Sequence, residues 1–350
     1  MTTLSSTPWM GLVLVVLAGG MCGIFALPMR FLGRWSWENV WAVFIVVSCI
    51  VLPAAVALYT APNLMRVLHA VPGHAVAAAC IAGFAWGFGA IMFGQGVSAI
   101  GLAMSNTLVL AISAALGSLL PMIVLAPERV HQPQGLAIIC GTAIGLAGIV
   151  CFGYAGFARD RSQASEIEQA RGAMVGNARP FGIGLLLCAG AGVLSAVLNI
   201  GFSLARPVIT TAAQHGDSAF AGSCIVWLLA LGSGAIPNLA FCGYLMAKHG
   251  SWRKFAASDG VMLYLAAVLM GLLWGGDILT YGYASPMLGK LGPAIGWPVK
   301  LIVGMLTANL AGMLLGEWRS TRAPERRWLA VGFVILFVAI AVLGWSSRLA

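Results

Sequence analysis

Ten apolar stretches, each long enough to cross a lipid bilayer, run through this 350-residue chain and constrain its fold more than any other feature. Inside a membrane only helices and closed barrels satisfy their backbone hydrogen bonds, and a spanning helix needs about 20 apolar residues. We therefore predict an all-α membrane protein with ten transmembrane helices. The predicted spans are residues 9–29, 40–59, 75–97, 102–126, 135–155, 181–204, 220–247, 260–283, 293–315 and 328–346.

The scarcity of charge supports a membrane location. Charged residues make up 8% of the chain and apolar residues 60%, whereas soluble domains carry about 25% charged residues. The basic residues lie in short loops between spans, which indicates contact with a lipid bilayer rather than with nucleic acid. Residues 1–8 contain no Lys or Arg, so we interpret the first span as permanent rather than as a signal peptide. The predicted location is the inner (cytoplasmic) membrane, with a multi-pass topology.

The longest polar segment divides the spans into five and five. We predict that residues 156–180 form a linker loop, residues 1–155 a first five-span repeat, and residues 181–350 a second. One motif occurs in both halves at a constant offset of 188 residues, as Gly83-x-x-Trp86-Gly87 and as Gly271-x-x-Trp274-Gly275. Two similar halves with an odd number of spans cross the membrane in opposite senses. The sequence therefore predicts two inverted repeats, an architecture that recurs in secondary transporters.

The distribution of basic residues predicts the orientation. The loops after spans one, three, five, seven and nine hold thirteen Lys and Arg residues, and the opposite side holds five. By the positive-inside rule the first side is cytoplasmic, so both termini face outward. Paired glycines four residues apart, such as Gly83 and Gly87, indicate closely packed helices, and a homodimer is a second possible use of such pairs.

Two ionisable residues lie within predicted spans and are candidates for proton coupling. Asp277 in span eight and Lys300 in span nine are each roughly 10 Å below the outer end of their span, at about 1.5 Å per residue. Desolvation favours the neutral form of a carboxylic acid, which suits a residue that loads and releases protons. Alternatively, Asp277 reaches water near the span end, or the two residues form an ion pair with a structural or gating role.

Polar and aromatic side chains within the spans are candidates for substrate binding. Amides both donate to and accept from hydroxyl groups, and the apolar face of a sugar ring packs against an aromatic face. The candidates are Trp86, Gln95, Asn106, Asn199, Trp274 and Tyr281. For each amide the alternative is an interhelical hydrogen bond, and for each aromatic residue it is packing or a position at the membrane interface.

Neither metal nor cofactor chemistry is indicated. The eight cysteines all lie in apolar segments without a C-x-x-C pair, and the five histidines lie in loops. We predict no metal, no cofactor, no disulfide and no catalytic residue. A membrane-embedded enzyme would need a cluster of His and acidic residues near one interface, which we do not find, and a non-transporting bundle would not need Asp277 and Lys300. The sequence thus favours a transporter over an enzyme.

Short motifs resemble those of a known family. Trp35-Ser36-Trp37-Glu38 followed by Trp41, Gly83-x-x-Trp86-Gly87-x-Gly89 in span three, and Glu317-Trp318 after span nine are similar to the L-rhamnose–proton symporters of the drug/metabolite transporter superfamily. The resemblance implies a five-plus-five inverted architecture and uptake of a sugar such as L-rhamnose, or a related monosaccharide, driven by protons. An exporter or exchanger of another small metabolite is the alternative.

Overall fold

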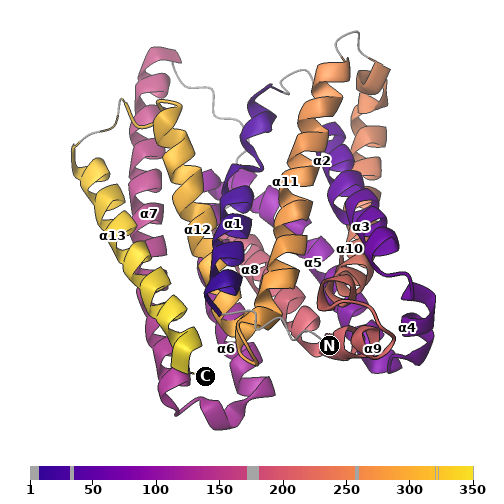
Figure 1. Cartoon of the computed structure of the whole chain (residues 1–350). Coiled ribbons are helices and arrows are strands. Elements are labelled where there is room, and N and C mark those ends of the chain that lie inside the picture. Colours follow the sequence, from indigo (N-terminus) through magenta and orange to yellow (C-terminus); the bar gives the residue numbers. More distant parts are fainter. Residues whose placement is uncertain are drawn as a thin grey trace.

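The protein is a bundle of long helices, as a computed structural model of the chain shows (Figure 1). The structure describes residues 8–31, 35–171, 181–256, 260–319, 321 and 323–349. Within these ranges it contains no strand, and ten of its helical segments are long and apolar enough to cross a membrane. The predicted all-α fold with ten spans is confirmed.

The helices correspond closely to the predicted spans. In chain order they are α1 (Pro8–Ile24), α2 (Trp37–Ile45), α3 (Leu52–Thr60), α4 (Leu64–Ala70), α5 (Gly73–Ile100), α6 (Leu102–Leu125), α7 (Pro133–Arg171), α8 (Phe181–Leu204), α9 (Arg206–Gln214), α10 (Ala219–His249), α11 (Gly260–Met287), α12 (Gly292–Leu314) and α13 (Ala323–Ser346). A π-helical segment, Val46–Val51, joins α2 to α3, so these three elements form one span. The short helices α4 and α9 connect spans and are absent from the prediction.

A single glycine separates spans three and four. Gly101 lies between α5 and α6 with φ of 82°, in the left-handed region that residues with a Cβ rarely adopt. The chain can therefore turn sharply without a polar loop. The split that bilayer thickness alone predicted at this uncharged position is confirmed.

The predicted linker loop is largely helical. Helix α7 continues beyond the membrane span as far as Arg171, and residues 172–180 lie outside the described part of the chain. Residues 156–171 are rich in Ala, Arg, Glu and Gln, which are strong helix formers, so a polar segment need not be a loop. The division of the chain into two repeats on either side of this segment remains a prediction.

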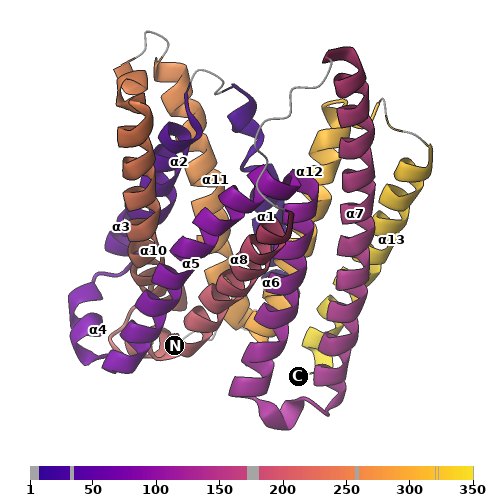
Figure 2. The same cartoon turned by 180° about the vertical axis from the view of Figure 1, so that it is seen from behind.

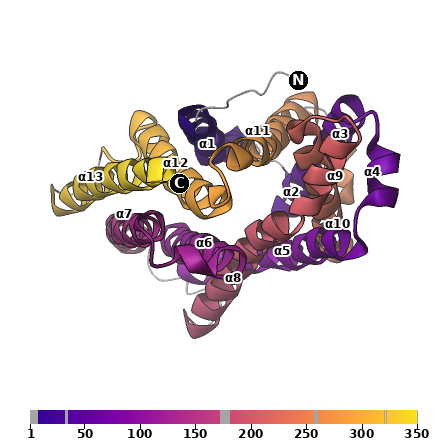
Figure 3. The same ribbon diagram turned by 60° about the horizontal axis from the view of Figure 1, so that its bottom comes forward.

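The packing of the spans has an internal correspondence. Helix α5 packs along α8 as α11 packs along α1, and α6 packs along α8 as α12 packs along α1. Likewise, α10 contacts α5, and the span formed by α2 and α3 contacts α11. Span one of the first half corresponds to span six, span two to span seven, and so on through spans five and ten. When each span is replaced by its counterpart, each of these contacts becomes the other member of its pair, as an inverted repeat requires. Figures 2 and 3 show these pairs from behind and along the bundle. The inverted repeat itself stays a prediction that this pattern supports.

Helix α12 is buried along most of its length. The first residue of α1 and the last of α13 lie at the same end of the bundle, as an even number of spans requires (Figure 1). Helix α12 begins at that end, and every residue from Gly292 to Leu306 except Pro293 is buried. Beyond that point Ala308 and Leu310 are exposed.

Candidate functional site

A buried ion pair lies within the buried part of α12. The Lys300 Nζ of α12 is 2.8 Å from the Asp277 Oδ1 of α11, and the two side chains are 2% and 0% exposed. An unpaired charge at such a position would cost several kcal/mol. The structure thus realises the pairing that the sequence left as one of its alternatives.

The pair lies deeper than the predicted span ends placed it. Helix α11 extends to Met287, ten residues beyond Asp277, and α12 starts at Gly292, eight residues before Lys300. At about 1.5 Å per residue both groups are roughly 12–15 Å from the helix ends, near the middle of a hydrocarbon core about 30 Å thick. Neither side chain reaches water at a span end.

Aromatic rings and a thiol complete the surroundings of the pair. The Lys300 Nζ lies 4.9 Å from the ring centroid of Trp297 and 5.5 Å from that of Tyr281, within cation–π range. Cys22 of α1 borders the carboxylate. Among the residues that the structure describes, no N–H or O–H group donates a hydrogen bond to Asp277 Oδ2. Within the described residues, the Lys300 ammonium and the Cys22 thiol are therefore the polar neighbours of this carboxylate.

A hydrogen-bond network fixes the helices around the pair. The Tyr281 hydroxyl donates to Asn199 Oδ1 of α8. The Asn199 Nδ2 donates to the carbonyl oxygen of Gly117 at 2.8 Å and to that of Pro293 at 3.3 Å. The side chains of Asn199 and Tyr281 are fully buried. In this conformation the Asn199 amide holds α6, α8, α11 and α12 together, which favours the interhelical alternative for this residue.

The two tryptophans of the repeated motif stack on each other. The ring centroids of Trp86 and Trp274 are 5.1 Å apart and their planes differ by 17°. Phe44 then packs edge-on against Trp274 at 5.8 Å, and Trp41 lies 4.8 Å from Phe44. Trp37 stacks on Trp41 at 5.1 Å. These five residues, which we term the aromatic column, run between span two, α5 and α11.

Hydrogen bonds lock the column to α10. The Trp41 Nε1 donates to Asn238 Oδ1 at 3.1 Å. The Asn238 Nδ2 donates in turn to the carbonyl oxygens of Gly87 and Gly234, at 3.2 and 3.0 Å. Trp86 is buried, whereas Trp37, Trp41 and Trp274 are half-buried. The column thus combines a rigid frame with partly accessible rings.

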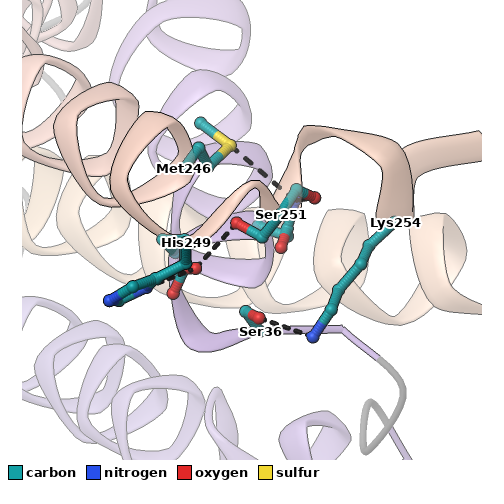
Figure 4. Close-up of polar contacts among 7 residues, drawn as sticks. Ser36, Met246, His249, Ser251 and Lys254 are labelled. Carbon is teal, nitrogen blue, oxygen red and sulfur yellow. Dashed lines mark hydrogen bonds and ion pairs between the residues drawn. The ribbon is translucent and has the colours of Figure 1, made fainter.

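A polar cluster ties the Trp37 end of the column to the short 3-10 helix Ser251–Ala256 that follows α10. Ser251 Oγ donates to Glu38 Oε1 at 2.7 Å, and His249 Nδ1 is 3.2 Å from the same oxygen. Lys254 Nζ donates to Ser36 Oγ at 2.7 Å. Figure 4 shows Ser36 and Lys254 facing each other beside His249 and Ser251. The start of α2, and with it Trp37, is thereby held to the end of α10.

The structure brings six of the eight predicted residues together in pairs. It joins Asp277 with Lys300, Asn199 with Tyr281, and Trp86 with Trp274. Gln95 and Asn106 are half-buried and belong to none of these pairs. Their role in substrate binding, like that of the others, stays a prediction.

Sequence reasoning did not assign Trp37, Trp41, Phe44 or Cys22 to the site. A signal for two of them exists, because Trp37 and Trp41 are four residues apart and so share one face of a helix. Phe44 and Cys22 carry no such signal, since single apolar residues in a span are indistinguishable from packing.

Comparison with known proteins identifies the family. The family described as L-rhamnose-proton symport protein (RhaT) matches residues 4–348 of this chain. The chain belongs to this family. The resemblance of the short motifs is thereby confirmed, and with it a multi-pass protein of the inner membrane.

Individual members of the L-rhamnose-proton symport family are distant from this chain but collinear with it. An L-rhamnose-proton symporter of Escherichia coli O1:K1 / APEC is 24% identical over 350 residues, which cover 97% of this chain and 98% of the relative. L-rhamnose-proton symporters of Yersinia pestis (strain Pestoides F) and Yersinia pseudotuberculosis serotype O:1b (strain IP 31758) are 22% identical over 344 residues, covering 96% of this chain and 97% of each relative.

Proposed function

We propose that this chain is a proton-coupled symporter that takes up L-rhamnose or a related monosaccharide. The observation that carries the proposal is a fully buried Asp277–Lys300 pair next to an aromatic column, in a chain whose family relatives are named L-rhamnose-proton symporters. A carrier of this kind needs a titratable group away from water and a surface for the sugar ring. It needs neither a catalytic residue nor a cofactor, so the proposal includes no enzymatic step.

Asp277 is the proposed proton carrier. Protonation of the carboxylate would end the ion pair and leave the Lys300 ammonium without its counter-ion. The rings of Trp297 and Tyr281 lie close enough to the ammonium to hold it in that state. The site then has two arrangements, and a sugar that favours one of them over the other is thermodynamically coupled to the proton.

The sugar is proposed to bind against the aromatic column. Trp274 precedes Asp277 by three residues on α11, so the two side chains lie on the same helix face. A pyranose ring on the half-buried face of Trp274 would be close to the proton site. Gln95 and Asn106 remain the proposed partners of the sugar hydroxyls.

Reconstituted protein is expected to accumulate L-rhamnose when a proton gradient, acidic outside, is imposed on proteoliposomes. A protonophore should abolish the accumulation, because the gradient is its only energy source. Competition by L-lyxose and L-mannose would measure how selective the site is among related monosaccharides. Sugar accumulation that persists with a protonophore and follows a sodium gradient would contradict proton coupling, and the absence of binding to any monosaccharide would contradict the sugar class.

The substitution Trp274→Leu is expected to weaken sugar binding while the protein stays folded. Loss of one aromatic face typically costs about 1–2 kcal/mol, which corresponds to a rise in KM of roughly 5- to 30-fold. The matched control is Trp345→Leu, because Trp345 is 56% exposed on α13 and lies outside the column. Initial uptake rates over a range of sugar concentrations give the KM of each variant. Equal KM values for the two variants would remove Trp274 from the sugar site.

A further inference from the structure

A pocket with a basic rim lies between the end of α12 and the start of α13, away from the site described above. Its volume is about 340 Å³. Its walls are formed by Met313, Trp318, Arg319, Arg326, Leu329, Ala330 and Phe333. The pocket is at the end of the bundle opposite the termini, where the sequence concentrates its basic residues.

Three donor groups at this rim have no acceptor among the residues that the structure describes. No carboxylate among the described residues forms an ion pair with Arg319 or Arg326, and both side chains are exposed. Trp318 is only 6% exposed, yet its Nε1 has no hydrogen-bond partner within the described part of the chain. A buried donor without an acceptor is costly, so the combination indicates an absent anionic group.

The acidic residue next to the rim does not supply that group. Glu317 Oε2 is 3.3 Å from the Arg159 Nη1 of α7, so its charge is already compensated. The Arg159 guanidinium also lies 4.8 Å from the ring centroid of Trp318, which adds positive charge beside the pocket. Among the described residues around the rim, the three arginines Arg159, Arg319 and Arg326 outnumber the two acids Glu317 and Glu325, so the local charge is positive.

The floor of the pocket is apolar and faces the membrane. Met313 lies in the last turn of α12, and Leu329 and Phe333 lie in the second and third turns of α13. Leu314, beside the pocket, is 84% exposed. The rim residues Trp318 and Arg319 lie between the ends of the two spans, where lipid headgroups are expected. A ligand must therefore carry a negative headgroup and an apolar chain below it.

We propose that this pocket binds an anionic phospholipid. Its phosphate would lie between Arg319 and Arg326, which can each donate two parallel hydrogen bonds to phosphate oxygens, and would accept a third contact from the Trp318 indole. One acyl chain would run over Met313, Leu329 and Phe333. Basic pockets between spanning helices on the cytoplasmic side suit such headgroups, and the excess of basic residues at this end predicts that side. A soluble phosphate would use the rim but not the floor.

Native mass spectrometry of the full-length protein tests the proposal with phosphatidylglycerol as the probe. The pocket variant carries Arg319→Gln and Arg326→Gln. The control carries Arg327→Gln and Arg348→Gln, which remove the same charge from exposed positions that do not line the pocket. At about 1 kcal/mol per basic residue, the pocket variant is expected to bind phosphatidylglycerol roughly 30-fold more weakly than the control. Phosphatidylcholine should not distinguish the two.

Two further arms make the result decisive. Thermal unfolding in detergent should show that phosphatidylglycerol raises the Tm of the wild type and control more than that of the pocket variant, and that inorganic phosphate does not. Trp318→Phe, which removes the N–H group together with the five-membered ring, should weaken lipid binding, and its Tm without lipid separates this effect from lost packing. Equal lipid binding by the pocket and control variants would overturn the proposal. An equal shift of Tm by inorganic phosphate would replace it with a soluble-anion site.

Discussion

Asp277→Asn is expected to abolish proton-driven accumulation of sugar and to leave sugar exchange partly intact. Asparagine keeps the size and hydrogen-bonding capacity of the side chain but cannot titrate, so the substitution isolates the charge. Coupling and recognition are separable free-energy terms, and only the first depends on the titration of this carboxyl group. Counterflow of labelled sugar across proteoliposomes measures exchange, and uptake against a concentration gradient measures coupling.

The ion pair makes a second outcome possible, and a double variant distinguishes the two. The Lys300 ammonium is 2.8 Å from Asp277 and 2% exposed, so the single change strands a buried cation. Removing one partner of a buried pair typically costs about 3–5 kcal/mol of stability. If the pair is purely structural, Asp277→Asn together with Lys300→Met should restore both folding and proton-driven uptake. If Asp277 carries the proton, the double variant should fold and exchange sugar without accumulating it.

A distant acid provides the control for this experiment. Asp217 precedes α10, and its Oδ1 accepts a hydrogen bond from Asn63 Nδ2 at 3.1 Å. Asp217→Asn should therefore keep proton-driven accumulation close to that of the wild type. Proton-driven accumulation of sugar by the Asp277→Asn, Lys300→Met double variant would contradict the hypothesis that Asp277 carries the proton, whatever the control shows.

The ten spans were predictable because hydropathy and bilayer thickness act on each segment separately. The uncharged break at Gly101 needed only the length of residues 75–126, which is too great for one crossing. Hydropathy does not predict where helix α7 ends. Its extension to Arg171 depends on helix propensity rather than on polarity, and polarity alone had suggested a loop.

The candidate site was partly predictable for a different reason. Equal depth on consecutive spans indicates that Asp277 and Lys300 can meet, and the structure shows them as an ion pair. The 188-residue repeat singles out Trp86 and Trp274, and the structure shows their rings stacked. Rotation of each helix about its axis is not encoded in span length. The sequence therefore could not show that the Asn199 amide is occupied by Tyr281 and two carbonyl groups.

The other members of the aromatic column could not be predicted, because they join it through contacts between distant parts of the chain. Phe44 belongs to the site only because span two lies against α11, and Trp41 only because Asn238 on α10 accepts its N–H. These contacts join residues about 190 to 230 positions apart. A single sequence contains hydrophobic periodicity within each helix, but it does not state which face meets which partner.

The substitution Gly83→Ala is expected to cause a severe loss of stability, because α5 contacts α10 closely at this glycine. A Cβ at Gly83 of α5 would lie 1.8 Å from the backbone carbonyl oxygen of Ala230 on α10. A backbone atom cannot rotate away as a side chain can, so the two helices must separate. Overpacking of a tight interface usually costs about 1–3 kcal/mol, and a backbone clash of this size should reach or exceed the upper value. Thermal unfolding in detergent and the yield of monodisperse protein measure the loss.

Two other glycines turn this prediction into a graded series. Gly271 is the counterpart of Gly83 in the second half. A Cβ there would lie 2.6 Å from Val47 Cβ and 3.2 Å from the Phe44 carbonyl oxygen, a smaller overlap than the one at Gly83. Gly232 of α10 has no heavy atom within 4 Å of its Cβ position. The Tm should therefore fall most for Gly83→Ala, less for Gly271→Ala, and not at all for Gly232→Ala, where the better helix propensity of alanine is the only change. A Gly83→Ala protein as stable as Gly232→Ala would contradict the close approach of α5 and α10, on which the position of Trp86 in the aromatic column depends.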